Sequence, residues 1–174
     1  MPLLIHGDTP WSLAVQLTRS QVRTYLRQRL SLGLNAIMFN LIEHRYGDAN
    51  PHPWTNQYGG PPFTGETRDG FLDFTAPDQE YWSQIDWIIS EADACGMLCF
   101  LVPAYVGFGH NSAGWARELK AHGAEGARAY GEFLGRRYGA RGNVIWVMGG
   151  DWGPVSDHHD LTHEVNALAG AIAA

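Results

Sequence analysis

Apolar and polar residues are arranged along the chain in two distinct patterns. Short runs are apolar at nearly every position, which is typical of parallel strands that are buried on both faces. Between these runs, apolar residues recur at every third or fourth position, which predicts amphipathic helices. The predicted strands cover residues 2–8, 34–42, 97–103 and 143–148, and the predicted helices cover residues 18–33, 77–96, 115–122, 124–138 and 161–172. Because a strand is followed by a helix four times over, the pattern predicts an α/β fold with a parallel sheet and right-handed crossovers.

Local signals support several of these boundaries. Thr18 and Gln21 have the spacing of a capping box at the start of the first helix, and Gly33 is placed to end that helix. Pro77 suits the first turn of the second helix, and Gly96 is placed to end it.

Residues 43–74 show no periodicity and are rich in Gly, Pro, Asn and Asp. A structureless connection of this length inside a compact domain is usually either functional or disordered. The segment also contains aromatic residues that argue against disorder, among them Tyr46, Trp54, Tyr58, Phe63 and Phe71. We therefore expect an ordered loop that serves the function of the protein.

Two architectures fit the order of the elements. One is a small open sheet that is complete in itself, and the other is the first half of a (β/α)8 barrel, which typically needs about 250 residues. The 174 residues hold four βα units with an enlarged second loop, and the first strand is not followed by a glycine-rich phosphate loop. We therefore interpret residues 1–174 as one partial catalytic domain, the truncated N-terminal half of a TIM barrel.

A half barrel would leave apolar surface uncovered. Its first and fourth strands would be unpaired edges, and the side chains of the barrel wall would face water. We expect this surface to be covered by a second copy of the chain in a homodimer or by the C-terminal half of the barrel. Otherwise the chain would be only marginally stable.

Composition narrows the range of partners and locations. The net charge is −6 and the basic residues form no cluster, so neither nucleic acid nor an anionic membrane is expected to bind. No apolar run approaches the ~20 residues that cross a bilayer, and the N-terminus lacks the features of a secretory signal. The expected location is the cytoplasm, or the periplasm or cell exterior if a leader has been removed. Cys95 and Cys99 would lie at a helix end and within a strand, a poor geometry for a disulfide, and we interpret them as reduced, buried thiols.

The clearest candidate for chemistry is Asp151. It follows Gly149 and Gly150 at the end of the fourth predicted strand, and the carboxyl ends of strands are where α/β folds place their active sites. Glycine has no Cβ, so these two positions allow a neighbouring group to approach the backbone closely. The alternative is that Asp151 caps the following helix, although Ser156 and Asp157 lie closer to the expected start of that helix.

Further candidates fall at the ends of the other strands. Asp8 and Glu43 are the candidates for a second carboxyl group, or they bind sugar hydroxyls, since carboxylates accept bidentate hydrogen bonds. The alternatives are an Asx-type turn at Asp8 and a solvated loop position for Glu43. Five more side chains are expected to supply stacking faces and polar contacts around a ligand: Trp11, Asn40, His44, Tyr105 and Trp152.

A metal site was weighed as an alternative. His6 and Asp8 share one face of the first strand, and His158, His159 and His163 cluster near the last helix. No His-Glu-x-x-His motif is present, and the histidine cluster has the character of a solvated helix start. We expect no metal and no other cofactor.

Four segments together resemble the apiosidase-like glycoside hydrolases, which are (β/α)8 barrels. These segments are GDTPWSL at residues 7–13, NAIMFNLIEH at 35–44, FLDFTAPDQEYW at 71–82 and NVIWVMGGDW at 143–152. The resemblance covers nearly the whole chain but only the N-terminal part of that family's barrel. It implies retaining hydrolysis of a glycosidic bond, with Asp151 as the general acid/base and with a nucleophile that lies later in the barrel and has no counterpart here.

The implied activity sets further expectations. The substrate would be a plant-type, pectic oligosaccharide whose side chains are cleaved. An acid must hold a proton near neutral pH, and desolvation beside Trp146 and Trp152 would raise the pKa of Asp151. The alternatives are a carbohydrate-binding protein without catalysis and a metal-dependent TIM-barrel hydrolase that uses His6 and Asp8.

Overall fold

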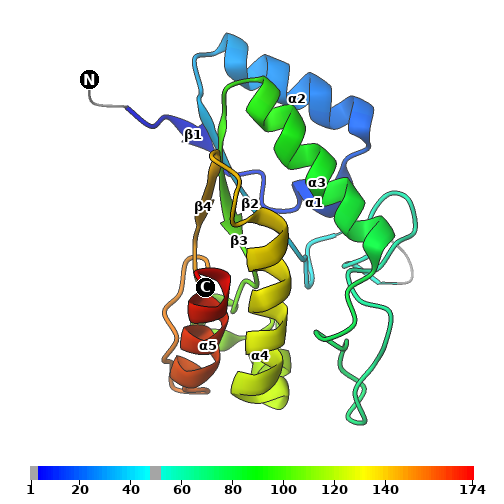
Figure 1. Cartoon of the computed structure of the whole chain (residues 1–174), viewed down its shortest axis with the longest axis vertical. Helices are drawn as coiled ribbons and strands as arrows, with labels where there is room; N and C mark the ends of the chain where they lie inside the picture. The colour runs from blue at the N-terminus through cyan, green and yellow to red at the C-terminus, as the bar shows by residue number, and fades with distance from the viewer. Residues whose placement is uncertain (1–3, 48–51) are drawn as a thin grey trace.

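The computed structural model describes residues 4–47 and 52–174 and contains a four-stranded parallel sheet in the order β1-β2-β3-β4. The strands are β1 (Gly7–Asp8), β2 (Ala36–Asn40), β3 (Leu98–Val102) and β4 (Val144–Trp146). All four point toward the end of the molecule where the last two helices lie (Figure 1). The predicted alternation of strands and helices is therefore confirmed.

The outer strands are shorter than the sequence pattern predicts. The strand expected over residues 2–8 is reduced to Gly7–Asp8, and its expected beginning at Pro2 lies outside the described residues. The strand expected over residues 143–148 is reduced to Val144–Trp146. In the described part of the chain, β1 pairs only with β2 and β4 only with β3. Each outer strand thus lacks a second neighbour, and the prediction of two unpaired edges is confirmed for these residues.

Helix α2 (Arg19–Ser31) begins as the sequence predicts. The Thr18 hydroxyl accepts a hydrogen bond from the Gln21 amide, and the Gln21 side chain accepts one from the Thr18 amide. Ahead of it lies a short helix, α1 (Leu13–Gln16), in a region that the pattern did not assign to a helix. Three consecutive residues of α1, Leu13 to Val15, are buried in the core. Tertiary packing therefore stabilises this short helix, which has no amphipathic pattern in the sequence.

Helix α3 (Gln79–Ala94) begins two positions later than the predicted start at Pro77. Asp78 is its N-cap, and the Asp78 carboxylate accepts hydrogen bonds from the amides of Glu80 and Tyr81. The placement of Pro77 in the first helical turn is therefore wrong. The proline precedes the cap and forms a β-bridge with Phe63 in the long loop.

Helix α4 (Ala116–Tyr138) contains both helices that were predicted between β3 and β4. At Gly123 the backbone has φ 64° and ψ −171°, which breaks the helix at the predicted point. The loop before it carries a short 3-10 helix, η1 (Phe108–His110), and α5 (Thr162–Ile172) ends the chain and packs alongside α4 (Figure 1). No described helix combines the length and apolar character of a membrane span.

One face of the sheet packs against the helices. Ile37 and Phe39 of β2 and Leu101 of β3 are fully buried there. Buried aromatic side chains also tie the loops to this core, since the Tyr81 hydroxyl donates to the Leu41 carbonyl and the Trp82 indole donates to the Pro62 carbonyl. The long loop is therefore ordered by its contacts in the described residues, as its aromatic content predicts.

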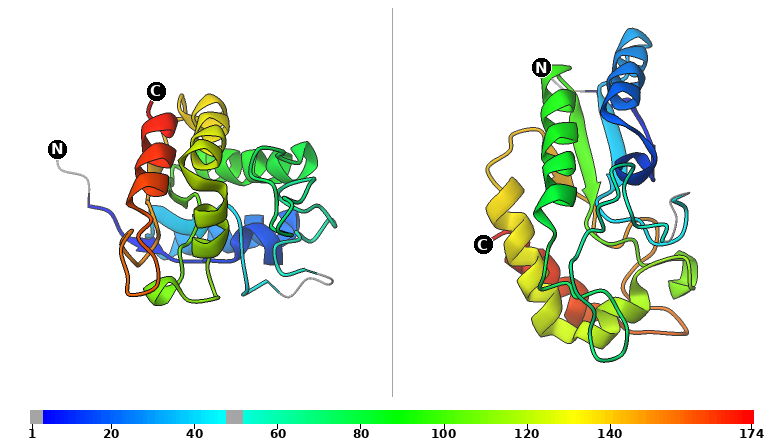
Figure 2. Two further views of the ribbon diagram at one scale, coloured as in Figure 1. Left: turned by 90° about the horizontal axis from the view of Figure 1, so that it is seen from below. Right: turned by 90° about the vertical axis from the view of Figure 1, so that its right-hand side faces the viewer.

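The opposite face of the sheet carries an apolar row. Met38 is aligned with Phe100, and Phe100 with Ile145, across β2, β3 and β4. Ile145 is 36% exposed, and none of the three belongs to the buried core. Figure 2 shows the strands and helices from two further directions, with residues 4–6 extending away from the body in the left view. An uncovered apolar wall is what the half-barrel interpretation predicts.

Candidate active site

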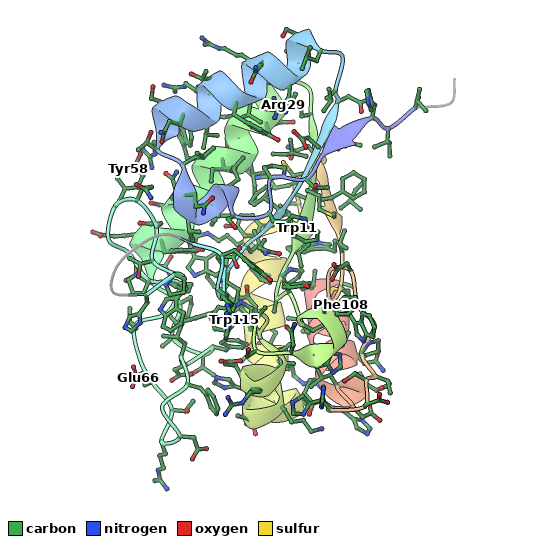
Figure 3. All side chains as sticks on the ribbon, turned by 180° about the vertical axis from the view of Figure 1, so that it is seen from behind. Trp11, Arg29, Tyr58, Glu66, Phe108 and Trp115 are labelled. Carbon is green, nitrogen blue, oxygen red and sulfur yellow. The ribbon has the colours of Figure 1, made fainter. Side chains whose placement is uncertain are left out.

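A cavity of about 250 Å³ lies at the carboxyl ends of the strands. Each strand, or the loop that follows it, contributes to its wall. The lining residues are Trp11, Asn40, Tyr46, Tyr105 and Asp151. Four of them are residues that the sequence analysis selected, so the predicted site is brought together by the fold. Figure 3 shows Trp11 near the strand ends at the centre of the molecule.

Hydrogen bonds between the strand-end loops hold these walls in place. The Asn40 amide donates to the Trp11 carbonyl at 2.9 Å, which joins the first two loops. The Val106 amide donates to the Gly149 carbonyl at 3.2 Å, which joins the last two. The cavity is therefore built on the sheet and does not depend on a single flexible loop.

Gly150 allows Tyr105 to reach the site. The backbone at Gly150 has φ +82°, a left-handed conformation that favours glycine. A Cβ at this position would lie 2.7 Å from Cδ2 of the Tyr105 ring. The expectation that the paired glycines permit a close approach is confirmed.

Tyr105 and Asp151 are neighbours in the cavity. Burial, together with the charge of Asp151 and a hydrogen bond to it, raises the pKa of Tyr105 to about 12. The phenol therefore remains protonated at neutral pH and is available as a hydrogen-bond donor beside the Asp151 side chain. On its other side, the Tyr105 ring lies 5.8 Å from the Trp11 ring, centroid to centroid.

The expected desolvation of Asp151 by two indoles is wrong. Asp151 is exposed, and Trp146 packs toward Tyr138 of α4 at 6.4 Å between ring centroids. Trp152 makes an edge-to-face contact with Phe108 at 4.7 Å and does not line the cavity. Asp151 does share the cavity with residues from the other three strand ends.

The alternative role of Asp151 as a helix cap is also wrong. Helix α5 begins at Thr162, and the Thr162 amide donates to the Asp160 carboxylate at 2.9 Å. Ser156 and Asp157, which lie nearer the helix than Asp151, are not its cap either, since Leu161 holds the N-cap position.

Glu43 lies behind the cavity wall. It is only 1% exposed, so a solvated loop position is wrong. Its carboxylate accepts hydrogen bonds from Ser12, from Asn40 and from the amides of the loop that it begins. Glu43 therefore contacts a lining residue, Asn40, without lining the cavity itself.

His44 is directed away from the cavity. Its Nε2 lies 3.0 Å from Oε1 of Glu118, and its ring meets Trp115 edge-on at 4.6 Å between centroids. These contacts fix the long loop to the start of α4. The structure thus does not bring His44 to the predicted sugar site.

Asp8 is likewise turned toward a helix. Its carboxylate accepts hydrogen bonds from Arg29 and from the Tyr25 hydroxyl, both on α2, while one oxygen also accepts from the Thr9 amide. The hydrogen bond from Arg29, followed by that from Tyr25, holds the pKa of Asp8 below its usual value. Asp8 therefore anchors β1 to α2 and is not among the cavity residues.

The Asp8 contacts make stability depend on acid pH. A carboxylate with a lowered pKa stabilises the folded state above its unfolded pKa of 3.8, and this contribution is lost as the pH falls through the folded pKa. We expect Asp8→Asn to lower the free energy of unfolding at pH 7, and the deficit to shrink below pH 3.8. Urea unfolding across this range measures the effect. Arg29→Ala should show the same trend, and a deficit in Asp8→Asn that stays constant with pH would contradict the assignment.

The residues considered for a metal site are not gathered around one point. Asp8 is occupied by the Arg29 guanidinium, which disfavours a cation there. Within residues 4–47 and 52–174, no group of three or more His, Cys, Asp or Glu side chains is arranged to hold an ion. The geometry thus offers no support for metal chemistry at His6 and Asp8.

Tyr46 is the lining residue that sequence reasoning missed. It belongs to the long aromatic loop, and its ring is more than half exposed. Its amide donates to Glu43 and its carbonyl accepts from Gln16. Its position just after the second strand was a usable signal, but the aromatic residues of the loop were interpreted only as evidence of order.

Comparison with known proteins places this geometry in a family. The family model described as apiosidase-like, catalytic domain, matches residues 1–174. Among curated proteins, none matches the chain. The family match agrees with the resemblance of the four sequence segments to the apiosidase-like glycoside hydrolases.

Solved structures agree with the fold. A family 5 glycoside hydrolase from Bacteroides vulgatus ATCC 8482 is 25% identical with a TM-score of 0.72, and the match covers 98% of this chain and 32% of that one. Another glycoside hydrolase is also 25% identical, with a TM-score of 0.68 and coverage of 98% and 34%. An endo-1,4-β-D-mannanase from Thermotoga petrophila RKU-1 is 10% identical with a TM-score of 0.53. The match covers 83% of this chain and 44% of the mannanase chain.

The chain thus spans about a third of the length of the first two of these structures. The neighbours confirm the predicted fold class, an α/β arrangement that forms part of a (β/α)8 barrel.

Proposed function

Because the chain belongs to the apiosidase-like family, we propose that it forms part of a retaining glycoside hydrolase in which Asp151 is the general acid/base. The observation that carries the proposal is the position of Asp151. Its carboxylate shares one cavity with side chains from the other three strand ends, where barrel enzymes place their catalytic groups.

The proposed reaction has two steps. In the first, Asp151 gives its proton to the glycosidic oxygen as the bond to the sugar breaks, while a second carboxylate forms a covalent bond to the anomeric carbon. In the second, Asp151 takes a proton from water, and the oxygen of that water displaces the carboxylate. We propose that Tyr105, which lies beside Asp151 in the same cavity, helps to orient the carboxyl group in both steps.

We propose that the second carboxylate comes from outside residues 1–174. Asp8 and Glu43 were the candidates within the chain. The first is paired with Arg29, and the second is buried behind the cavity wall. Retention requires two carboxyl groups about 5–5.5 Å apart, and Asp151 is the only carboxylate that lines the cavity in the described part of the chain.

The proposed substrate is a pectic, plant-type oligosaccharide that carries apiose, the sugar to which the family description points. The aromatic rings of Trp11, Tyr46 and Tyr105 supply apolar faces on which the C–H groups of a sugar can pack. Asp151 and Asn40 supply polar contacts in the same cavity.

One observation favours a second function, carbohydrate binding without hydrolysis. The described lining of the cavity holds a single carboxylate, which is sufficient to bind a sugar but is only one of the two carboxyl groups that hydrolysis needs. If the full-length protein binds apiose-bearing pectic oligosaccharides without releasing sugar, this second function holds and the enzymatic proposal fails.

Proton NMR of the first-formed product tests the proposed mechanism. The full-length protein should release sugar from pectic oligosaccharides, and the new reducing end should initially have the anomeric configuration of the substrate. An initially inverted product would rule out the retaining mechanism. Loss of activity with a chelator, restored by zinc or manganese, would favour the metal-dependent alternative instead.

A further inference from the structure

Glu43 is surrounded by hydrogen-bond donors on both of its oxygens. Its Oε1 accepts from the amides of His44, Arg45 and Tyr46 at 2.9, 3.3 and 3.2 Å. Its Oε2 accepts from the Ser12 hydroxyl at 2.8 Å and from Nδ2 of Asn40 at 3.3 Å. The two oxygens therefore have separate tasks, since one orders the loop backbone and the other contacts side chains.

This arrangement determines which way the Asn40 amide points. A carboxylate can only accept hydrogen bonds, so Asn40 must turn its NH2 group toward Glu43. Its Oδ1 then points elsewhere. Asn40 is 2% exposed and lines the cavity, and its Oδ1 is buried without a partner in residues 4–47 and 52–174.

A buried acceptor without a partner costs free energy, and such groups in native structures call for an explanation. Asn40 lies in the same cavity wall as Asp151 and the aromatic rings that would contact a sugar. A sugar hydroxyl is a donor of the kind that Oδ1 lacks.

We propose that Glu43 is a positioning residue that fixes Asn40 as the acceptor for a hydroxyl group of the bound sugar. The inference rests on the proposed function, because it assumes that the cavity binds a sugar. It also predicts selectivity, since a site built to bind a hydroxyl rejects an analogue that lacks it.

Glu43→Gln tests the proposal with little change of shape. The new side chain can keep its oxygen where Oε1 lies, facing the three backbone amides, and place its NH2 group where Oε2 lies. Ser12 can accept from that group. Asn40 must rotate its amide to accept as well, and this places NH2 where Oδ1 lies in the wild type.

The kinetic result should separate binding from chemistry. With 4-nitrophenyl apioside and the full-length protein, we expect Glu43→Gln to raise KM about 5- to 20-fold, the effect of losing one hydrogen bond to a buried group. We expect kcat to change by less than about twofold, because the hydroxyl is bound similarly in the ground and transition states.

A second substitution should restore the acceptor. In the Glu43→Gln background, Asn40→Asp provides one oxygen to accept from the introduced amide and leaves the other free. We expect KM to return to within about threefold of the wild-type value. Asn40→Asp alone should bind more weakly than wild type, because it sets two carboxylates against each other.

The outcomes distinguish this inference from the proposed function. Failure of the wild-type protein to cleave or bind the apioside overturns both. If the wild type is active, an unchanged KM in Glu43→Gln overturns only the role of Glu43. A third outcome is a Glu43→Gln variant with a lower kcat and a higher KM that unfolds at a lower denaturant concentration and is not rescued by Asn40→Asp. This outcome would show that Glu43 merely supports the loop.

Discussion

Asp151→Asn is expected to lower kcat for a pectic oligosaccharide by about 10²- to 10⁴-fold, the range that general acid–base catalysis contributes. Asparagine keeps the size of the side chain but cannot donate a proton to the leaving oxygen. It can still accept a hydrogen bond from Tyr105, so the cavity should keep its shape. Steady-state assays of released sugar with the full-length protein measure the effect.

The nature of the leaving group provides an internal control. A 4-nitrophenolate leaves without much help from an acid, so the loss should be smaller for 4-nitrophenyl apioside than for the oligosaccharide. Asp157→Asn, an exposed position in the same loop, should retain full activity. Equal losses on both substrates, or an active Asp151→Asn variant, would contradict the assignment of Asp151 as the acid/base.

Much of the fold follows from local patterns in the sequence. The capping box at Thr18 and the break at Gly123 were predicted from residue type alone, and each is determined by backbone chemistry within a few residues. The parallel order of the strands follows from their alternation with helices. Asp151 and Tyr105 could be placed at the site because the carboxyl ends of parallel strands lie along one edge of the sheet.

The direction of the other candidate side chains could not be predicted, because it depends on strand register. Successive side chains on a strand point to opposite faces, so a shift of one residue reverses every side chain. Asp8 is aligned with Ile37, whose side chain packs on the helix side, and Asp8 accordingly faces α2. Asn40 lies on the opposite face of the same strand as Ile37 and reaches the cavity.

Loop geometry accounts for the remaining differences. His44 and Trp152 were selected because they follow strand ends, but each is held by aromatic contacts with a distant loop or helix, at Trp115 and Phe108 respectively. These contacts arise between segments that are far apart in sequence. Neither composition nor periodicity carries information about them.

The second large effect is expected at the backbone beside Asp151, the proposed acid/base. We expect Gly150→Ala to lower kcat/KM for 4-nitrophenyl apioside on the order of 10²-fold, because small displacements of catalytic groups have effects of this size. The added Cβ would lie 2.7 Å from the Tyr105 ring, and the backbone has φ +82°. The left-handed conformation alone costs a non-glycine residue about 1–2 kcal/mol. The ring must therefore move away from Asp151, or the loop must move with the carboxylate.

Gly153→Ala is the matched control for this substitution. It lies in the same loop, and a Cβ there would meet nothing within 4 Å. This variant should keep wild-type kcat/KM, while Gly150→Ala should also disturb the burial of the Tyr105 phenol and its contact with Asp151, which together raise the pKa of that phenol. Its phenol should then titrate below the pKa of about 12 that burial and Asp151 give it, which absorbance of the phenolate can follow against a Tyr105→Phe reference. Equal activity in the two alanine variants would mean that the contact between Tyr105 and Asp151 does not matter for catalysis, and the geometric basis of the proposed acid/base would be lost.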